Sequence, residues 1–450
     1  MEMPPKPPSR PDKVSLRHYM RLFKQDLLSA QPARLYRAWM AEFRTPFFRS
    51  YLLNQPDLVK TVLKDRPDDF PKSGRVAEGL RPLLGDSVFL TNGEAWKRQR
   101  RIIDPAFEGG RLREIYPAMF QAAHASVARL ETQLGRPIEI EEEASHAAAD
   151  IIFRTLFSIP IEHQVASQVF DQFRTYQRSQ PILNIAALVP LPRWMPRFFG
   201  RSTKRTAREI RRLITQLTEA RAAEIAAGQA PDDLATKIMT TKDPQTGALF
   251  SPQEMVDQVA IFFLAGHETS ASSLAWTLYL MALYPEWQDK VAAEAQSFEG
   301  TDFGQVSQLK LSRDVVRESL RLYPPVPMMV RQNSCPEVFR DRDIKPGGQM
   351  VLSPWHLHRH ERLWENPDGF DPARWHTENG KHCMREAYIP FSSGPRVCTG
   401  AGFAMVEAVL MLSMILKHYR IKRVAGRDPR PVAHLTVRSA EGIWLEFERR

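Results

Sequence analysis

The chain of 450 residues contains few cysteines, namely Cys335, Cys383 and Cys398. Because an odd number of cysteines cannot all pair with one another, a disulfide framework is excluded as the basis of the fold. Sparse cysteines are typical of a reducing compartment, where a lone thiol packs in the core or acts as a reactive or metal-binding thiolate. The sequence therefore predicts a cytoplasmic protein in which one thiol is a candidate for chemistry.

Long apolar runs are also absent. The best of them, residues 259–266, falls well short of the roughly 18 apolar residues that cross a membrane. Residues 1–13 contain five prolines and no apolar stretch, which is unlike a signal peptide or a membrane anchor. We therefore expect no transmembrane segment and a flexible, partly polyproline lead-in over residues 1–13.

Blocks of like charge are missing too, although lysine and arginine (62) outnumber aspartate and glutamate (52) for a net charge of +10. Long basic blocks are the usual mark of nucleic-acid binding, so no nucleic-acid partner is expected. The sequence also lacks a glycine-rich phosphate loop, a serine-hydrolase elbow and paired zinc-type cysteines. The positive balance suits an anionic surface or an acidic protein partner.

The periodicity of the chain is mainly helical from about residue 14 to residue 320 and again from 401 to 418. Between 323 and 375 the sequence is proline-rich and irregular, and short strands are expected at 47–53, 349–352, 434–437 and 443–447. No Gly/Ser-rich linker interrupts the chain. We therefore predict a mainly α fold with a smaller β portion, organised as a single domain over residues 14–450 of a monomer.

The clearest predicted element is a long helix that follows Ser251. Ser251 and Glu254 form a capping box with Pro252 at the first helical position, and Pro285 ends the helix. The intervening 32 or so residues would span roughly 48 Å. Its middle holds Ala265, Gly266, His267, Glu268 and Thr269.

Those central residues are poor choices for a plain helix. Glycine costs about 1 kcal/mol relative to alanine, and threonine can bend a helix by bonding to an earlier carbonyl. In one interpretation Glu268 points to solvent and Gly266 permits a close helix crossing. In the other, these residues form part of a functional site.

A loop over residues 391–400 delivers Cys398 to the start of the 401–418 helix. A helix N-terminus and the nearby charge of Arg396 both stabilise a thiolate, which suits a metal ligand. Gly394 and Gly400 would let the backbone approach a bulky planar group. The alternative is a small buried cysteine that only fills space.

With every fixed position of F-x-x-G-x-R-x-C-x-G occupied, the chain resembles the cytochrome P-450 family of haem-thiolate monooxygenases. The resemblance implies the cytochrome P-450 fold, with haem b between the long central helix and the cysteine-loop helix, and Cys398 as the iron ligand. The cofactor-binding residues that it implies are Trp96, Arg100, Ala265, Gly266, Arg331, Phe391, Gly394, Arg396, Cys398 and Gly400.

The resemblance also assigns roles away from the cysteine. Glu318 and Arg321, with Arg374, would form a buried structural network beneath the haem. Arginine forks suit carboxylates, and Trp96, Arg100, Arg331 and Arg396 would bind the haem propionates. Ala265 and Gly266 would open room above the iron, and Glu268 and Thr269 would be the catalytic pair that delivers protons during oxygen activation.

Family segments that face substrate are mostly apolar in this chain, which implies a hydrophobic substrate such as a fatty acid or terpenoid. The predicted pocket includes residues 182–194 together with Val88, Phe89, Leu90, Phe262, Ala265, Val326, Met328 and Met329. Because no flavin or iron–sulfur domain is recognised, electrons are expected from NAD(P)H through a separate acidic ferredoxin or flavodoxin. The cations Lys97, Arg98, Arg101, Arg111 and Arg113 would steer that partner, or would simply be solvated.

Two alternatives stay open. The chain could be a haem-binding sensor or carrier without turnover, although Glu268 and Thr269 favour a monooxygenase. Separately, His356, His358 and His360 would share one face of a strand and could bind zinc, whereas their flanking sequence favours a structural loop.

Overall fold

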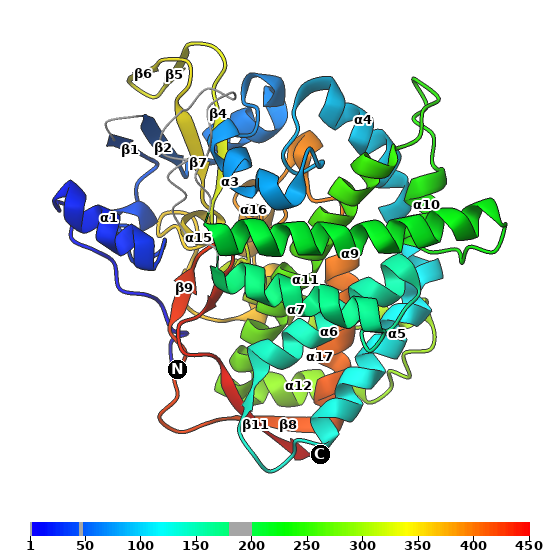
Figure 1. Ribbon diagram of the computed structural model, residues 1–450. Coiled ribbons are helices and arrows are strands. Elements are labelled where there is room, and N and C mark those ends of the chain that lie inside the picture. The colour runs from blue at the N-terminus through cyan, green and yellow to red at the C-terminus, as the bar shows by residue number, and fades with distance from the viewer. Residues whose placement is uncertain (1, 45–47, 180–199) are drawn as a thin grey trace. The chain divides into compact units, whose positions relative to one another are not determined.

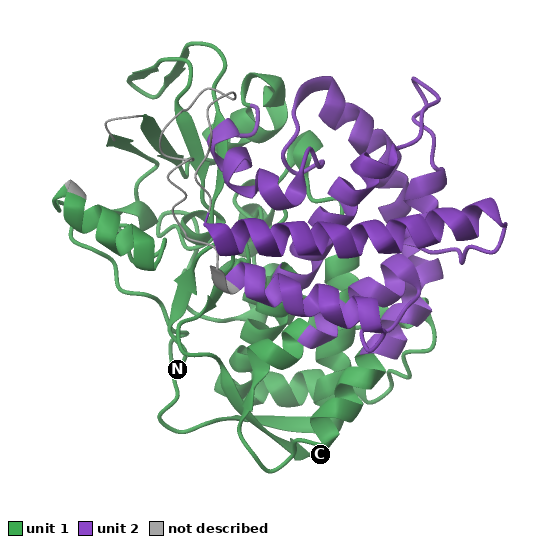
Figure 2. Cartoon of the chain, in the orientation of Figure 1, with its two compact units in different colours: residues 1–70, 123–145, 269–450 green, residues 71–122, 146–268 purple. Residues whose placement is uncertain are grey.

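A computed structural model of the chain describes residues 2–44, 48–179 and 200–450. The chain forms two compact units, which are coloured separately in Figure 2. Unit 1 comprises Met1–Phe70, Ala123–Ser145 and Thr269–Arg450, and unit 2 comprises Pro71–Ala122 and His146–Glu268. Helices dominate and strands are a minority, so the prediction of a mainly α fold with a smaller β portion is confirmed.

Unit 1 contains the described strands (Figure 1). Its largest sheet has the order β1-β2-β7-β4, in which β2 runs parallel to β7 and the other pairs are antiparallel. Smaller sheets pair β3-β11-β8, β9-β10 and β5-β6. The strands are β1 Met40–Arg44, β2 Arg49–Leu53, β3 Ile138–Glu139, β4 Met329–Gln332, β5 Glu337–Phe339, β6 Arg342–Ile344, β7 Gln349–Leu352, β8 Tyr419–Arg423, β9 Pro431–Ala433, β10 Val437–Ser439 and β11 Trp444–Arg449.

The helices of unit 1 surround an apolar core, and α17 packs against both α12 and α14. The helical segments are α1 Leu16–Gln25, η1 Ala33–Tyr36, α2 Pro56–Lys60, η2 Thr61–Asp65, η3 Pro67–Asp69, α12 Pro285–Ala295, α13 Phe303–Val306, α14 Lys310–Leu322, α15 Pro354–Leu357, η5 Pro372–His376, α16 Glu378–Glu386, η6 Gly394–Arg396 and α17 Ala401–His418.

Unit 2 is helical. Its long helix α9 contacts α7, α3 and α10, and α7 runs along α9 in Figure 1. The rings of Phe153, Phe157 and Phe173 gather around Phe263 in its core. Its helices are α3 Gly74–Leu84, α4 Gly93–Ile103, η4 Asp104–Phe107, α7 Gln164–Ser179, α9 Arg201–Ala226 and α10 Leu234–Thr240.

Three helices pass from one unit into the other: α5 Gly109–Glu131, α6 Ile140–Phe157 and α11 Pro252–Leu283. The 32-residue α11 is the long helix predicted from the sequence. Its capping box forms as expected, because Ser251 N donates to Glu254 Oε2 at 2.8 Å and Glu254 N donates to Ser251 Oγ at 3.3 Å. The helix ends just before Pro285, where α12 begins.

The predicted strands at 47–53, 349–352 and 443–447 correspond to β2, β7 and β11, and residue 47 lies outside the described residues. The predicted strand at 434–437 is wrong. Residues 434–436 form a turn between β9 and β10, closed by a hydrogen bond from His434 N to Thr436 O at 3.2 Å. The alternating pattern is real, but it belongs to two short antiparallel strands in which Val437 pairs with Ala433.

The lead-in at residues 2–10 makes specific contacts within unit 1. The Tyr284 hydroxyl donates to Glu2 O at 2.6 Å, and the Tyr323 hydroxyl donates to Pro5 O at 2.8 Å. Lys6 Nζ lies 2.9 Å from Asp368 Oδ2. This segment therefore provides hydrogen-bond acceptors for both phenol hydroxyls. The flexibility of residues 1–13 and the start of the domain at residue 14 stay predictions.

Candidate functional site

The loop before α17 has a conformation that requires its glycine. Gly394 has a φ of +71°, and a side chain there would collide with the carbonyl group of Leu63. The loop is closed by a hydrogen bond from Cys398 N to Phe391 O at 2.9 Å. Cys398 is exposed at the start of α17, and a Cβ added at Gly400 would meet no protein atom within 4 Å. The loop thus presents a thiol beside open space.

The other two cysteines lie in different surroundings. Cys383 is buried on α16, where burial raises the pKa of its thiol to about 11, and its Sγ donates to Leu363 O at 3.1 Å. Cys335 is half-buried, and Arg66 lies 3.7 Å from its Sγ. Cys398 therefore differs from both in being exposed and placed at a helix N-terminus, as a ligand thiolate would be.

Unit 1 also contains a buried network of ions centred on Glu318 of α14. Arg321 donates to both carboxylate oxygens of Glu318, at 2.9 and 2.8 Å, and Arg374 Nε donates to Glu318 Oε1 at 3.2 Å. The remaining donors of Arg321 reach the carbonyls of His358 at 2.9 Å and Gly369 at 2.7 Å. The network thus ties α14 to η5 and to the chain that precedes η5, and its predicted role beneath the haem stays a prediction.

Two buried arginines of unit 1, Arg331 and Arg396, lie near enough for their charges to interact. Arg331 on β4 is only 8% exposed, and burial together with the charge of Arg396 lowers its pKa to about 10. No carboxylate in the described part of the chain pairs with Arg331. Arg396 donates to Pro67 O at 2.6 Å and lies 3.5 Å from Asp68 Oδ1. Two close buried cations of this kind are stabilised by a bound anion, so they fit the propionates of the haem that the resemblance implies.

Replacing Arg331 by leucine is expected to weaken haem binding about tenfold, the effect of losing one charge-assisted hydrogen bond. The haem-free protein should be equally stable or more stable, because the substitution removes a buried cation that repels Arg396. Haem titration and urea unfolding of the haem-free protein measure the two quantities. Arg342→Leu on β6, where Arg342 is exposed, is the matched control. Unchanged haem affinity would show that Arg331 does not bind a propionate.

Trp96 and Arg100 lie together on α4 in unit 2. The Arg100 guanidinium is 5.8 Å from the centre of the Trp96 ring, and Lys72 Nζ is 5.6 Å from it. Arg100 Nε also lies 2.7 Å from Asp104 Oδ1. The i, i+4 pair therefore has the expected geometry, and its role at a propionate stays a prediction.

The middle of α11 agrees in part with each of the two interpretations of its sequence. Glu268 is only 5% exposed, so the interpretation in which it points to solvent is wrong. A Cβ on Gly266 would lie 2.5 Å from Ile152 Cδ1, so this glycine permits a close crossing of α6 and α11. Ala265 beside it is exposed although it lies in the middle of a long helix. Space next to α11 is therefore found at Ala265 rather than at Gly266.

The predicted substrate residues divide between the units. Val326, Met328 and Met329 belong to unit 1, and the others belong to unit 2. Phe89 is 45% exposed and Val326 is also exposed, whereas Leu90 is buried. The ring of Phe262 packs 5.7 Å from that of Phe107. Residues 182–194 lie outside the described residues.

The basic residues expected to steer a partner are largely neutralised within unit 2. Lys97 lies 3.1 Å from Glu94, Arg98 lies 2.6 Å from Glu254, Arg101 lies 2.6 Å from Asp243, and Arg111 lies 2.7 Å from Asp232. Exposed ion pairs leave little field at a distance. Four of the five predicted steering cations therefore have a carboxylate beside them.

The zinc interpretation of the three histidines is wrong. They lie on and just after the short helix α15 rather than on a strand, and the structure has no cluster of three metal-binding side chains among the residues it describes. His358 Nε2 accepts from Ile389 N at 2.9 Å, and His356 Nδ1 lies 2.8 Å from Ser353 Oγ. Burial lowers the pKa of both rings to about 3, as expected for neutral histidines in a core.

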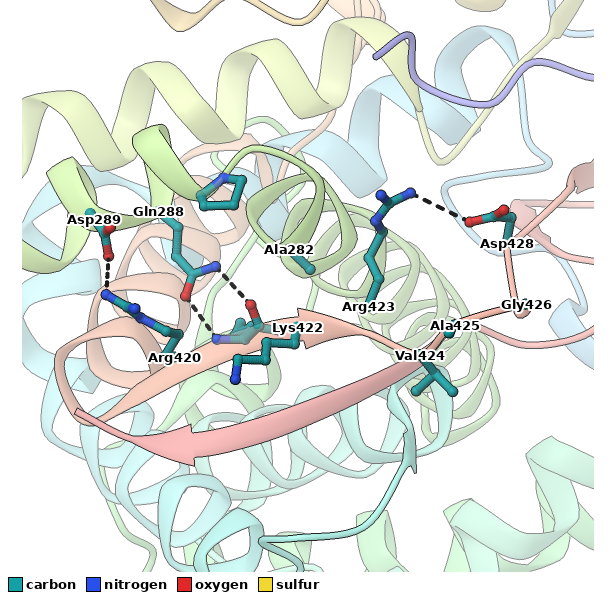
Figure 3. Close-up of a pocket in the computed structure, with 12 residues that line it drawn as sticks. Ala282, Gln288, Asp289, Arg420, Lys422, Arg423, Val424, Ala425, Gly426 and Asp428 are labelled. Atoms are coloured by element: carbon teal, nitrogen blue, oxygen red, sulfur yellow. Dashed lines mark hydrogen bonds and ion pairs between the residues drawn. The ribbon is translucent and has the colours of Figure 1, made fainter. Parts of the chain in front are cut away.

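A surface pocket of about 520 Å³ in unit 1 contains no predicted site residue. It lies beside β8 (Figure 3), and four of its charged side chains form two ion pairs. Arg420 lies 3.3 Å from Asp289, and Arg423 lies 3.5 Å from Asp428. This pocket offers no group suited to the predicted chemistry.

Sequence reasoning missed one buried acid, Glu407 on α17. It is 3% exposed and accepts a hydrogen bond from Ser270 on α11. A signal was available, because Glu407 is the sole charged residue between Ala401 and Leu416. Among the described helices, only α17 is apolar and long enough to cross a membrane, and most of its length is buried inside the protein.

Comparison with known proteins places these features in a wider group. The family model for cytochrome P-450 matches residues 36–446. A cyclooctat-9-en-7-ol 5-monooxygenase from Streptomyces melanosporofaciens is 30% identical over 421 residues, which cover 91% of this chain and 88% of that protein. A cytokinin hydroxylase from Arabidopsis thaliana is 30% identical over 408 residues, which cover 87% of this chain and 77% of that protein. The crystal structure of a cytochrome P450DA haem domain superposes with a TM-score of 0.81 and 23% identity, over 100% of this chain and 98% of that one.

Proposed function

Because the chain belongs to the cytochrome P-450 family and is one of its monooxygenases, we propose that it hydroxylates or epoxidises a hydrophobic small molecule with electrons from a separate protein. The observation that carries the proposal is the cysteine loop. It exposes Cys398 at a helix N-terminus, and the same unit contains the buried network of Glu318. Haem b, when bound through the Cys398 thiolate, supplies the activation of dioxygen.

The residues of this chain would then divide the work. Arg331 and Arg396 would hold the propionates, and the family resemblance gives Trp96 and Arg100 the same role. Ala265 would leave space beside α11 for substrate. Glu268 would hold a proton near the hydroxyl of Thr269, which would pass it on at the reacting oxygen.

The proposed substrate is an apolar molecule such as a terpenoid or a fatty acid. Support comes from the apolar residues Val88, Phe89, Val326, Met328 and Met329. The name of one relative specifies cyclooctat-9-en-7-ol and that of another specifies a cytokinin. A library of terpenoids and fatty acids, added to the ferric protein, should include compounds that shift the Soret band. The same compounds should stimulate reductant consumption, and binding without such stimulation would indicate a sensor or carrier.

The proposed electron donor is an acidic ferredoxin or flavodoxin, reduced by NAD(P)H in the cytoplasm. The net charge of +10 supports an acidic partner, although the cations around α4 are mostly paired. Lys60 on α2 and Lys64 on η2 are exposed in unit 1, although Lys60 lies 3.9 Å from Asp65, and η2 packs against η6 of the cysteine loop. We expect these two lysines to contribute more to docking than Arg98 or Arg101.

Replacing Thr269 by alanine is expected to preserve the spectrum of the carbon-monoxide complex and to lower product formed per reductant consumed by about tenfold. The reason is that an apolar pocket without the hydroxyl has no positioned proton donor, so oxygen leaves as hydrogen peroxide. Product and peroxide are measured together in one reductant-limited reaction. Thr277→Ala, farther along α11, is the control. Equal coupling in the Thr269 variant and the wild type would exclude a role for the hydroxyl.

A further inference from the structure

Glu407 is a carboxyl group in an apolar environment. Its side chain is 3% exposed on α17, whose buried neighbours include Phe403, Leu410 and Met411. Burying an ionised carboxylate without a cation is costly, so such a group is stabilised in its neutral form. No cation in the described part of the chain forms an ion pair with Glu407. A buried acid retained in this position needs an explanation beyond packing.

The hydrogen bond of Glu407 leads to the centre of the proposed site. Ser270 Oγ donates to Glu407 Oε2 at 2.7 Å, and Ser270 directly follows Thr269 on α11. The helix that carries Glu407, α17, begins three residues after Cys398. A single hydrogen bond thus connects the helix that begins at the cysteine loop with the turn that carries Thr269.

Two opposing contributions set the pKa of Glu407. Burial raises its pKa to about 8, and the hydrogen bond from Ser270 opposes this rise because it favours the charged form. The elements that pack against α17, namely α12, α13, α14 and β8, contribute no charged group to this shift, and neither does α11. At neutral pH the group is therefore mainly an uncharged carboxylic acid.

We propose that Glu407 is a positioning residue for Thr269, and that as a neutral acid it holds the Ser270 turn of α11 against α17. The proposal rests on the proposed function, since the orientation of Thr269 has consequences only in a monooxygenase. Ionisation would place an unpaired charge in the core, so the carboxylate would draw in water and release the turn. Coupling should therefore fall in alkaline solution.

Two substitutions separate the neutral hydrogen bond from the acidic proton. Glu407→Gln keeps an uncharged acceptor, so coupling at pH 7 should equal that of the wild type and the alkaline fall should disappear. Glu407→Leu removes the acceptor, so peroxide per reductant should rise about fivefold at every pH, the factor expected from loss of one ordinary hydrogen bond. Ser413→Ala is the matched control, because the hydroxyl of Ser413 on α17 bonds Ser312 of α14 at 3.1 Å rather than Ser270 of α11.

Ser270→Ala gives a result that a purely structural role would not produce. The substitution removes the hydrogen bond and, with it, the donor that favours the charged form. Coupling at pH 7 should therefore fall as in Glu407→Leu, and the pH dependence of unfolding should give Glu407 a midpoint above the wild-type value near 8. A midpoint that stays in place or moves lower would overturn the proposal. Wild-type coupling in Glu407→Leu would also overturn it. If Glu407→Gln uncouples as strongly as Glu407→Leu, the proton itself is required and positioning by a neutral group is wrong.

A measurement of stability tests the Ser270–Glu407 hydrogen bond without requiring enzymatic turnover. The pKa of Glu407 in the folded protein, about 8, exceeds the ordinary value of 4.5, so its stabilising contribution is complete below the lower value and is lost as the pH rises through the higher one. Urea unfolding from pH 5 to pH 9 should show a steeper loss in the wild type than in Glu407→Gln. Equal slopes of unfolding free energy against pH in the two proteins would overturn the proposal. If the slopes differ as expected but the wild type shows no monooxygenase activity, only the proposed function is wrong.

Discussion

Replacing Cys398 by serine is expected to abolish the strongly red-shifted Soret band of the reduced, carbon-monoxide-bound protein, together with monooxygenase activity. The band requires a thiolate ligand, and a serine hydroxyl is neither ionised at neutral pH nor a comparable electron donor to iron. Loss of activity should be complete within the sensitivity of product detection. Haem content, measured separately, shows whether the variant still binds the cofactor.

The other two cysteines provide the controls for this experiment. Cys383→Ser and Cys335→Ser should retain the band, because Cys383 is buried with a raised pKa and Cys335 lies on the loop between β4 and β5. A red-shifted band in Cys398→Ser, or its absence in Cys383→Ser or Cys335→Ser, would show that the ligand had been assigned to the wrong cysteine.

Replacing Glu318 by glutamine is expected to lower the free energy of unfolding by about 3–5 kcal/mol. The carboxylate accepts from both Arg321 and Arg374, and all three side chains are buried. Glutamine would leave two buried guanidinium groups without a counter-charge. We expect the variant to lose much of its haem as well, because the network holds the chain that leads to the cysteine loop.

Urea unfolding of the wild type and the variant measures the stability change. Arg317→Ala is the matched control on α14, since Arg317 forms a partly exposed ion pair with Asp314 at 3.0 Å and such pairs contribute less than about 1 kcal/mol. A loss in Glu318→Gln no larger than that in Arg317→Ala would show that the network does not stabilise the fold.

Local signals of the sequence were sufficient for the features that depend on neighbouring residues. The capping box at Ser251 defined the start of α11, and the apolar run before Lys417 defined α17. The motif around Cys398 located the loop through its resemblance to a family pattern, although Gly394 lies against Leu63 and Arg396 donates to Pro67, 329 positions away. The two helices, by contrast, need little information from distant parts of the chain.

Features that depend on distant contacts were less predictable. The pairing of Arg98 and Arg101 involves Glu254 and Asp243, more than 140 positions away, so a group of cations was interpreted as a basic face. Gly266 was assigned to open space, whereas Ile152 of another helix occupies that side. Glu407 gave a signal in its own helix, but its partner Ser270 is 137 positions away.

The division into two units has a consequence for recombination with relatives. The chain passes between the units four times, and one passage lies between Glu268 and Thr269 within α11. No single crossover can therefore exchange one unit as an intact cassette. A chimera joined between residues 268 and 269 would take the carboxyl group at position 268 from one parent and the hydroxyl group at position 269 from the other. Residue 407, the hydrogen-bond partner of residue 270, would come from the same parent as residue 269.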